Sequence, residues 1–119
     1  MTGPHEILAA WEAGDEPDRA AVKDAVKRTL AVLVEAAPGR AVEVRVPPYA
    51  AVQAVGGTTH RRGTPPAVVE CDARTWLGLA TGTVSWDDAV ADGRVRASGE
   101  RSDLSHLLPL PLSPESDDR

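Results

Sequence analysis

The hydrophobic period of this chain changes at Pro38-Gly39, and the change limits the chain to folds that combine helices with a sheet. In residues 22–34, apolar side chains recur every three or four positions. This stripe, which includes Thr29, predicts one long amphipathic helix. In residues 42–46, valines alternate with charged residues, which is typical of a strand with one buried face. The sequence therefore predicts an α+β domain.

Shorter elements are expected on both sides of this change. Asp72 and Ser85 are good helix N-caps, and glycines end most of the predicted elements. The predicted order is ααβββααβα, with further helices at residues 4–13, 73–80, 86–92 and from Asp103, and further strands at 49–55, 67–71 and 94–98. These four strands favour a small, mostly antiparallel sheet with helices packed on one face.

The chain has 119 residues, enough for one domain. We expect an N-terminal helical segment at 1–14, the domain at 15–110 and an acidic disordered tail at 111–119. The net charge of −5 argues against nucleic acid as a partner. No apolar run approaches a transmembrane segment, the N-terminus does not resemble a signal peptide, and a single cysteine fits a reducing compartment, so we expect a cytoplasmic protein.

Few residues suggest catalysis. The three histidines are far apart in sequence and match no metal-site spacing, and no phosphate-binding loop or dinucleotide motif occurs, so we expect no metal and no cofactor. Cys71 lies before a predicted helix N-terminus, where a thiol can be activated, but it also fits a small buried side chain. The sequence favours a protein that is not an enzyme.

Two groups of residues are candidates for binding. The apolar group either completes the core or lines a cavity for an apolar ligand, and its members are Trp76, Leu79, Trp86, Val90 and Leu107. The basic group, His60, Arg61 and Arg62, could hold an anion or a lipid head group, although two arginines in a loop are often only solvated.

The second half of the chain resembles the C-terminal half of sterol carrier protein-2-like (SCP2-like) domains. In residues 72–110, a helix with a glycine-ended turn is followed by a second helix ending in glycine, a strand, another glycine and a last helix. The matching points are Trp76, Leu79, Gly82, Ala89, Gly93, Val95, Gly99, Leu104 and Leu107. The Pro-Pro-Tyr at 47–49 and the Arg-Gly-Thr-Pro-Pro at 62–66 further resemble a small bacterial, actinobacterial branch of this family.

The resemblance implies a five-stranded sheet, helices on one side and a hydrophobic tunnel between the layers. The strand patterns account for four strands, and the fifth would lie near Val84 or within residues 56–66, so we expect a mostly antiparallel, four- to five-stranded sheet. Family members bind sterols, acyl chains or other apolar molecules and are not enzymes in isolation. We therefore expect a non-enzymatic carrier of an apolar small molecule. The alternative is an accessory or protein-interaction module with a filled interior, a use of the fold seen in the domain attached to mycothiol-dependent isomerases. The sequence does not identify a protein partner or an oligomeric state.

Overall fold

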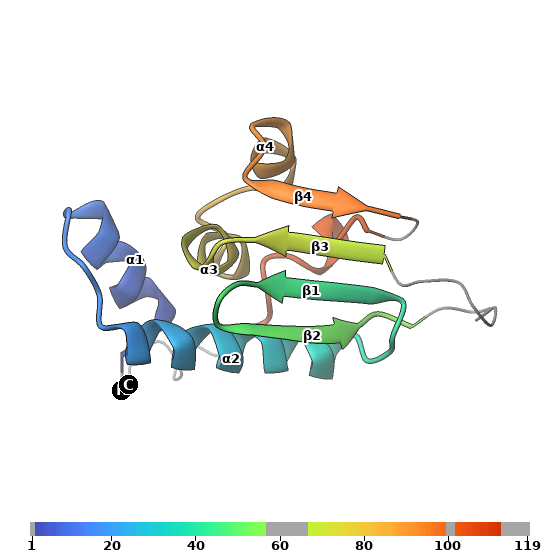
Figure 1. The fold of residues 1–119 in the computed structure, drawn as a ribbon, viewed down its shortest axis with the longest axis horizontal. Helices are drawn as coiled ribbons and strands as arrows, with labels where there is room; N and C mark the ends of the chain where they lie inside the picture. Colours follow the sequence, from blue (N-terminus) through green and yellow to red (C-terminus); the bar gives the residue numbers. More distant parts are fainter. Residues whose placement is uncertain (1, 57–66, 100–101, 113–119) are drawn as a thin grey trace.

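The computed structural model of the chain describes residues 2–56, 67–99 and 102–112 (Figure 1). The helices are α1 (Pro4–Glu12), α2 (Arg19–Ala36), α3 (Ala73–Thr81) and α4 (Trp86–Ala91), and the strands are β1 (Val42–Val46), β2 (Ala50–Ala54), β3 (Ala67–Cys71) and β4 (Val95–Ser98). A short 3₁₀ turn, η1, covers Ser105–Leu107. This order confirms the α+β class and every element boundary to within a few residues, except for the last helix.

The four described strands form one mixed sheet in the order β2-β1-β3-β4. β1 pairs with β2 and β3 pairs with β4 in antiparallel fashion, but β1 and β3 are parallel. The sheet is therefore not purely antiparallel. Along the chain, β1, β2 and β3 alternate in direction, so β1 and β3 run the same way. Because β3 lies beside β1 rather than beside β2, the β1–β3 pairing is parallel.

The predicted fifth strand is not found among the described residues. Val84 lies in a bend between α3 and α4, and residues 57–66, the other proposed location, fall outside the described part. The described sheet therefore has four strands.

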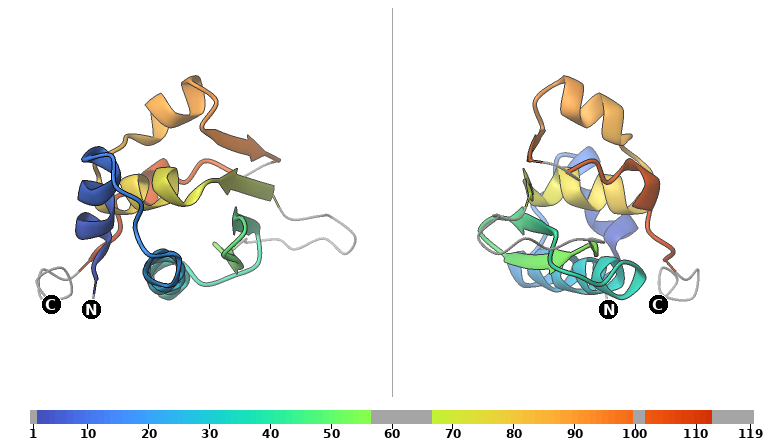
Figure 2. Two further views of the ribbon diagram at one scale, coloured as in Figure 1. Left: turned by 60° about the vertical axis from the view of Figure 1, so that its left-hand side comes forward. Right: turned by 90° about the vertical axis from the view of Figure 1, so that its right-hand side faces the viewer.

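The two faces of the sheet differ as the alternation predicts. On β1, Val42, Val44 and Val46 are fully buried, whereas Arg45 is exposed and forms an ion pair with Glu43 at 2.7 Å. The register places Val69 of β3 beside Val44, so the buried side continues across the strands. Helices α2 and α3 lie on that side of the sheet (Figure 2).

Helix α3 lies at the centre of the core. Seven of its nine residues are buried, as expected for a helix surrounded by other elements. Gly78 is needed here, because a Cβ on it would lie 2.5 Å from Cγ2 of Val84. The loop that follows α3 therefore packs directly on the helix.

Another close approach joins the end of α2 to the end of β2. Val55 has a φ of 66°, an unfavourable value for a β-branched residue. Its N–H donates to the carbonyl of Ala37 at 2.6 Å, and its carbonyl accepts from Ala41 at 2.8 Å. Gly39, with φ of 145°, lies against the backbone of Val55 and Gly56, where no Cβ would fit.

The C-terminal part of the domain is less helical than predicted. The sequence predicts a short final helix from Asp103, and the structure forms the shorter 3₁₀ turn η1 there, because Pro109 follows closely and cannot continue a helix. Leu104 is buried, and the N–H of Leu110 donates to the carbonyl of Ala80 at 2.9 Å. This segment therefore returns onto the end of α3.

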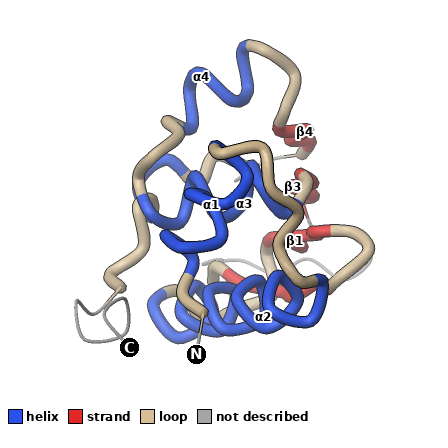
Figure 3. The backbone as a smooth tube through the Cα atoms, turned by 90° about the vertical axis from the view of Figure 1, so that its left-hand side faces the viewer, coloured by secondary structure: helices blue, strands red, loops and turns tan. Residues whose placement is uncertain are grey.

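Helix α1 packs on the rest of the domain. It contacts α3 and α2, and Figure 3 shows α1 and α3 side by side above α2. Ile7 is 1% exposed, and Nη2 of Arg28 donates to the carbonyl of Thr2 at 3.0 Å. The N-terminal helix is thus attached through both a buried side chain and a backbone contact.

Candidate functional site

The five apolar candidates from the sequence differ in their burial. Trp76 and Leu79 are each 1% exposed, and Trp86 is 9% exposed, whereas Leu107 is half-buried and Val90 is 41% exposed at the surface of α4. None of the five lines either of the two clefts described below. That they line an apolar cavity stays a prediction.

Trp76 also has a polar role in the core. Its Nε1–H donates a hydrogen bond to Oγ1 of Thr29 at 2.8 Å. The Thr29 hydroxyl in turn lies 2.7 Å from the carbonyl of Ala25, to which it can donate. The indole is therefore anchored to α2, as a buried N–H requires.

The basic candidates His60, Arg61 and Arg62 lie outside the described residues. The hypothesis that they bind an anion therefore stays a prediction.

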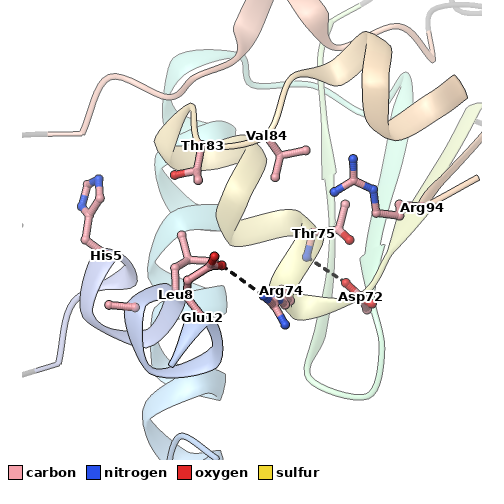
Figure 4. Close-up of a pocket in the computed structure, with 10 residues that line it drawn as sticks. His5, Leu8, Glu12, Asp72, Arg74, Thr75, Thr83, Val84 and Arg94 are labelled. Atoms are coloured by element: carbon pink, nitrogen blue, oxygen red, sulfur yellow. Dashed lines mark hydrogen bonds and ion pairs between the residues drawn. The ribbon is translucent and has the colours of Figure 1, made fainter. Parts of the chain in front are cut away.

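A half-open cleft of about 720 Å³ lies between α1, α3 and the start of β4 (Figure 4). One wall comes from a single face of α1, formed by residues spaced three or four apart: His5, Leu8, Ala9 and Glu12. Its size is within the range of about 300–1,000 Å³ that is typical of small-molecule sites.

The opposite wall comes from segments far along the chain. Asp72, Arg74 and Thr75 contribute from the start of α3, and the remaining residues are Thr83, Val84 and Arg94. The Asp72 side chain accepts from the N–H of Thr75 at 2.8 Å and so caps α3. The cleft combines aliphatic surface from Leu8, Ala9 and Val84 with charged groups.

The charged groups at the cleft are held to different degrees. Nη2 of Arg74 lies 3.4 Å from Oε2 of Glu12, and this long contact joins α3 to α1. Arg94 is held more tightly, because its Nε donates to both carboxylate oxygens of Asp92 at 2.9 Å. These hydrogen bonds keep the pKa of Asp92 below its ordinary value.

A smaller cleft of about 490 Å³ lies between α2 and the C-terminal segment. It is lined by Arg28, Thr29, Val32, Glu35, Ala36, Pro111 and Leu112. Thr29 thus lies between this cleft and the buried indole of Trp76.

Cys71 does not have the surroundings of a nucleophile. It is 5% exposed, and burial, together with the charges of Asp72 and Glu70, raises the pKa of its thiol to about 12. The reactive form is the thiolate, which is therefore almost absent at neutral pH. The structure agrees with a small buried side chain at this position.

Sequence reasoning did not identify the larger cleft. It predicted a helix at residues 4–13 and assigned no functional role to Leu8, Glu12 or Arg74. The spacing of His5, Leu8, Ala9 and Glu12 was a usable signal for one helix face. What this face lies against depends on α3, which begins some sixty positions later in the chain.

Within 2–56, 67–99 and 102–112, no group of three His, Cys, Asp or Glu side chains is arranged to hold a metal ion. None of the described helices has the length and hydrophobicity needed to cross a membrane.

The fold and the cleft define a small α+β domain with a ligand-sized opening between helices. The sequence comparison identifies the family: the family described as bacterial SCP ortholog matches residues 18–110, most of the chain, and the protein belongs to it. This confirms the resemblance found in the sequence. No curated protein matches the chain. The family match begins at α2, so α1 lies outside it.

Proposed function

We propose that this protein is a non-enzymatic binding protein for a small amphipathic molecule, which occupies the cleft between α1 and α3. The observation that carries the proposal is the cleft itself, which joins aliphatic side chains to a few charged groups at ligand size. Membership of the SCP family supports a carrier of apolar molecules. The proposal places the ligand between helices at the surface rather than against Trp76 and Trp86.

The packing of the core supports this placement. Trp76, Leu77 and Leu79 are each at most 1% exposed and belong to one continuous cluster. A ligand beside Trp76 would have to displace core side chains, and losing such contacts costs about 2–5 kcal/mol for each large aliphatic residue. Binding in the open cleft requires no such displacement.

The absence of an activated nucleophile among the described residues supports a binding role rather than catalysis. Cys71 is buried and protonated, and the charged residues of the cleft are ion-paired or cap a helix. Binding without chemical change therefore accounts for these features more simply than catalysis does.

The proposal is tested by filling the cleft. Ala9 is exposed and lines it, so Ala9→Trp should block the opening without disturbing the core. Octanol and octanoate should raise the melting temperature of the wild type and give heat in calorimetric titration, because a ligand that binds only the native state stabilises it. Ala9→Trp should abolish both effects.

Ala31→Trp is the matched control, because Ala31 is an exposed alanine of α2 that lines neither cleft. It should bind as the wild type does. If neither probe stabilises the wild type at millimolar concentration, the proposal is wrong. Equal affinities of Ala9→Trp and the wild type for the probes would show that the ligand binds at another site, which would overturn the proposed placement.

A second candidate function is an accessory module that binds no small molecule. The burial of Trp76 and Leu79 favours it, because both side chains are 1% exposed, as expected of core residues. The same titration decides between the two, since an accessory module shows no response to either probe.

A further inference from the structure

We infer that the cleft between α1 and α3 selects amphiphiles that carry an anionic group, and that Arg74 binds this group in exchange for Glu12. The inference rests on the proposed function and adds the ligand class and the residue that determines it. The shared chemistry of the ligands is a negatively charged oxygen on a carboxylate or a phosphate.

Arg74 is available for such an exchange. A guanidinium has five N–H donors, and among the described residues only Glu12 accepts from the one on Arg74. That contact is 3.4 Å long, beyond the distance of about 2.7–2.9 Å typical of charge-assisted hydrogen bonds. A ligand anion could approach more closely and use two donors at once.

The contact between Arg74 and Glu12 is also weakly held. The two side chains are 54% and 83% exposed, so water screens their attraction. Exposed pairs of this kind contribute little to stability. Replacing Glu12 by a ligand oxygen therefore costs little and keeps the charge of Arg74 compensated.

The other charged groups of the cleft favour an anion over a cation. The carboxylate of Asp72 is engaged by the Thr75 N–H at the N-terminus of α3, where the helix dipole also compensates its charge. Arg94 lies at the far wall, but Asp92 already compensates its charge, so Arg74 is the guanidinium left for a ligand. Arg74 cannot lose its proton at neutral pH, so a cationic head group beside it would meet a fixed positive charge.

The cleft also offers an aliphatic surface for the alkyl part of the ligand. Leu8 on α1 and Val84 on the opposite side line the same cleft (Figure 4). Ala9 of α1 also lines it. Arg74 and Glu12 lie along the wall next to these side chains. An alkyl chain can therefore rest on the aliphatic surface while its head group reaches Arg74.

This arrangement makes Glu12 an internal competitor of the ligand. Removing its charge leaves Arg74 uncompensated and ready to bind. Glu12→Gln should increase the affinity for octanoate and octyl phosphate by about twofold to fivefold, the range expected for loss of an exposed ion pair. Arg74→Gln should decrease both affinities by roughly tenfold or more, because hydrogen bonds to charged groups are lost.

The test is calorimetric titration of four probes that share an octyl chain: octanoate, octyl phosphate, octanol and octyltrimethylammonium. Glu16→Gln is the control for Glu12→Gln, and Arg40→Gln is the control for Arg74→Gln. Each control makes the same change in net charge as its partner variant, at an exposed residue that lines neither cleft. Neither control should change the affinity for any probe by as much as twofold. Octanol binding should be unchanged in all four variants.

The outcomes separate this inference from the proposed function. If Glu12→Gln and Arg74→Gln change the affinities for octanoate and octanol equally, the inferred anion selectivity is wrong, but the proposed ligand binding is not. If octyltrimethylammonium binds the wild type more tightly than octanoate, the selectivity is reversed. If no probe binds, both proposals are wrong. A response to only one of octanoate and octyl phosphate assigns the head group to that anion.

Discussion

The indole Nε1–H of Trp76 donates to Oγ1 of Thr29 across 2.8 Å, and both side chains are buried. This bond connects the central helix α3 to α2, which lie side by side in the core. Thr29 stands on the apolar stripe of α2, so its hydroxyl is the polar group that Trp76 meets there.

Thr29→Val should destabilise the protein by about 1–3 kcal/mol, because the buried indole N–H loses its acceptor. The measurement is the free energy of unfolding in urea. In a Trp76→Phe background the same substitution should cost much less, since no N–H is left unsatisfied. Equal costs in the two backgrounds would show that the hydrogen bond contributes nothing measurable.

Cys71 should give the stability an alkaline dependence. The pKa of the thiol is raised from 9.0 to about 12 in the folded protein, so the folded state keeps a proton that the unfolded state loses. This contribution is complete below pH 9 and is lost as the pH rises towards 12, by up to about 1.4 kcal/mol per pH unit.

The measurement compares wild type and Cys71→Ala by urea unfolding between about pH 8 and pH 10.5, so that other titrating groups cancel. The difference between the two proteins should shrink as the pH rises. Iodoacetamide should also react with native Cys71 far more slowly than with the unfolded chain. A native rate equal to that of free cysteine would contradict the burial of the thiol.

Gly78→Ala should destabilise the protein although alanine is the better helix former. The new Cβ would lie 2.5 Å from Cγ2 of Val84, and such overpacking costs about 1–3 kcal/mol. Thermal unfolding measures the loss. Val84→Ala in the same chain should restore part of it, and no recovery would mean that the strain lies elsewhere.

Leu79 and Val90 should respond very differently to truncation, although the sequence placed both in one apolar group. Leu79→Ala should cost about 2–5 kcal/mol because it opens a cavity in the core. Val90→Ala should change the stability by about 0.5 kcal/mol or less, since its side chain is 41% exposed. Similar losses in the two variants would contradict this assignment.

The parts of the fold that depend on local patterns could be predicted from the sequence. The stripe of α2, the alternation of β1 and the caps at Asp72 and Ser85 are all present, and both cap side chains accept the expected backbone N–H. In each case neighbouring residues determine the backbone conformation, so the signal lies within a few positions.

The parts of the fold that depend on contacts between distant segments could not be predicted from the sequence. The parallel pairing of β1 with β3 depends on which strand the returning chain lies beside, and no local pattern encodes this. The cleft could not be predicted for the same reason, because Glu12 and Arg74 meet only when α1 packs on α3. The sequence indicated the amphipathic character of each element but not the surface that two of them form together.

Helix α1 lies outside the residues that match the family, yet it supplies one whole wall of the cleft. Under the proposed function, the ligand would therefore contact one wall that belongs to the shared scaffold and one that does not. Substitutions on the exposed face of α1 are then expected to alter the affinity for the aliphatic part of a ligand while the sheet and its central helix keep their structure. Arg74, on the scaffold side, would keep the preference for an anionic head group.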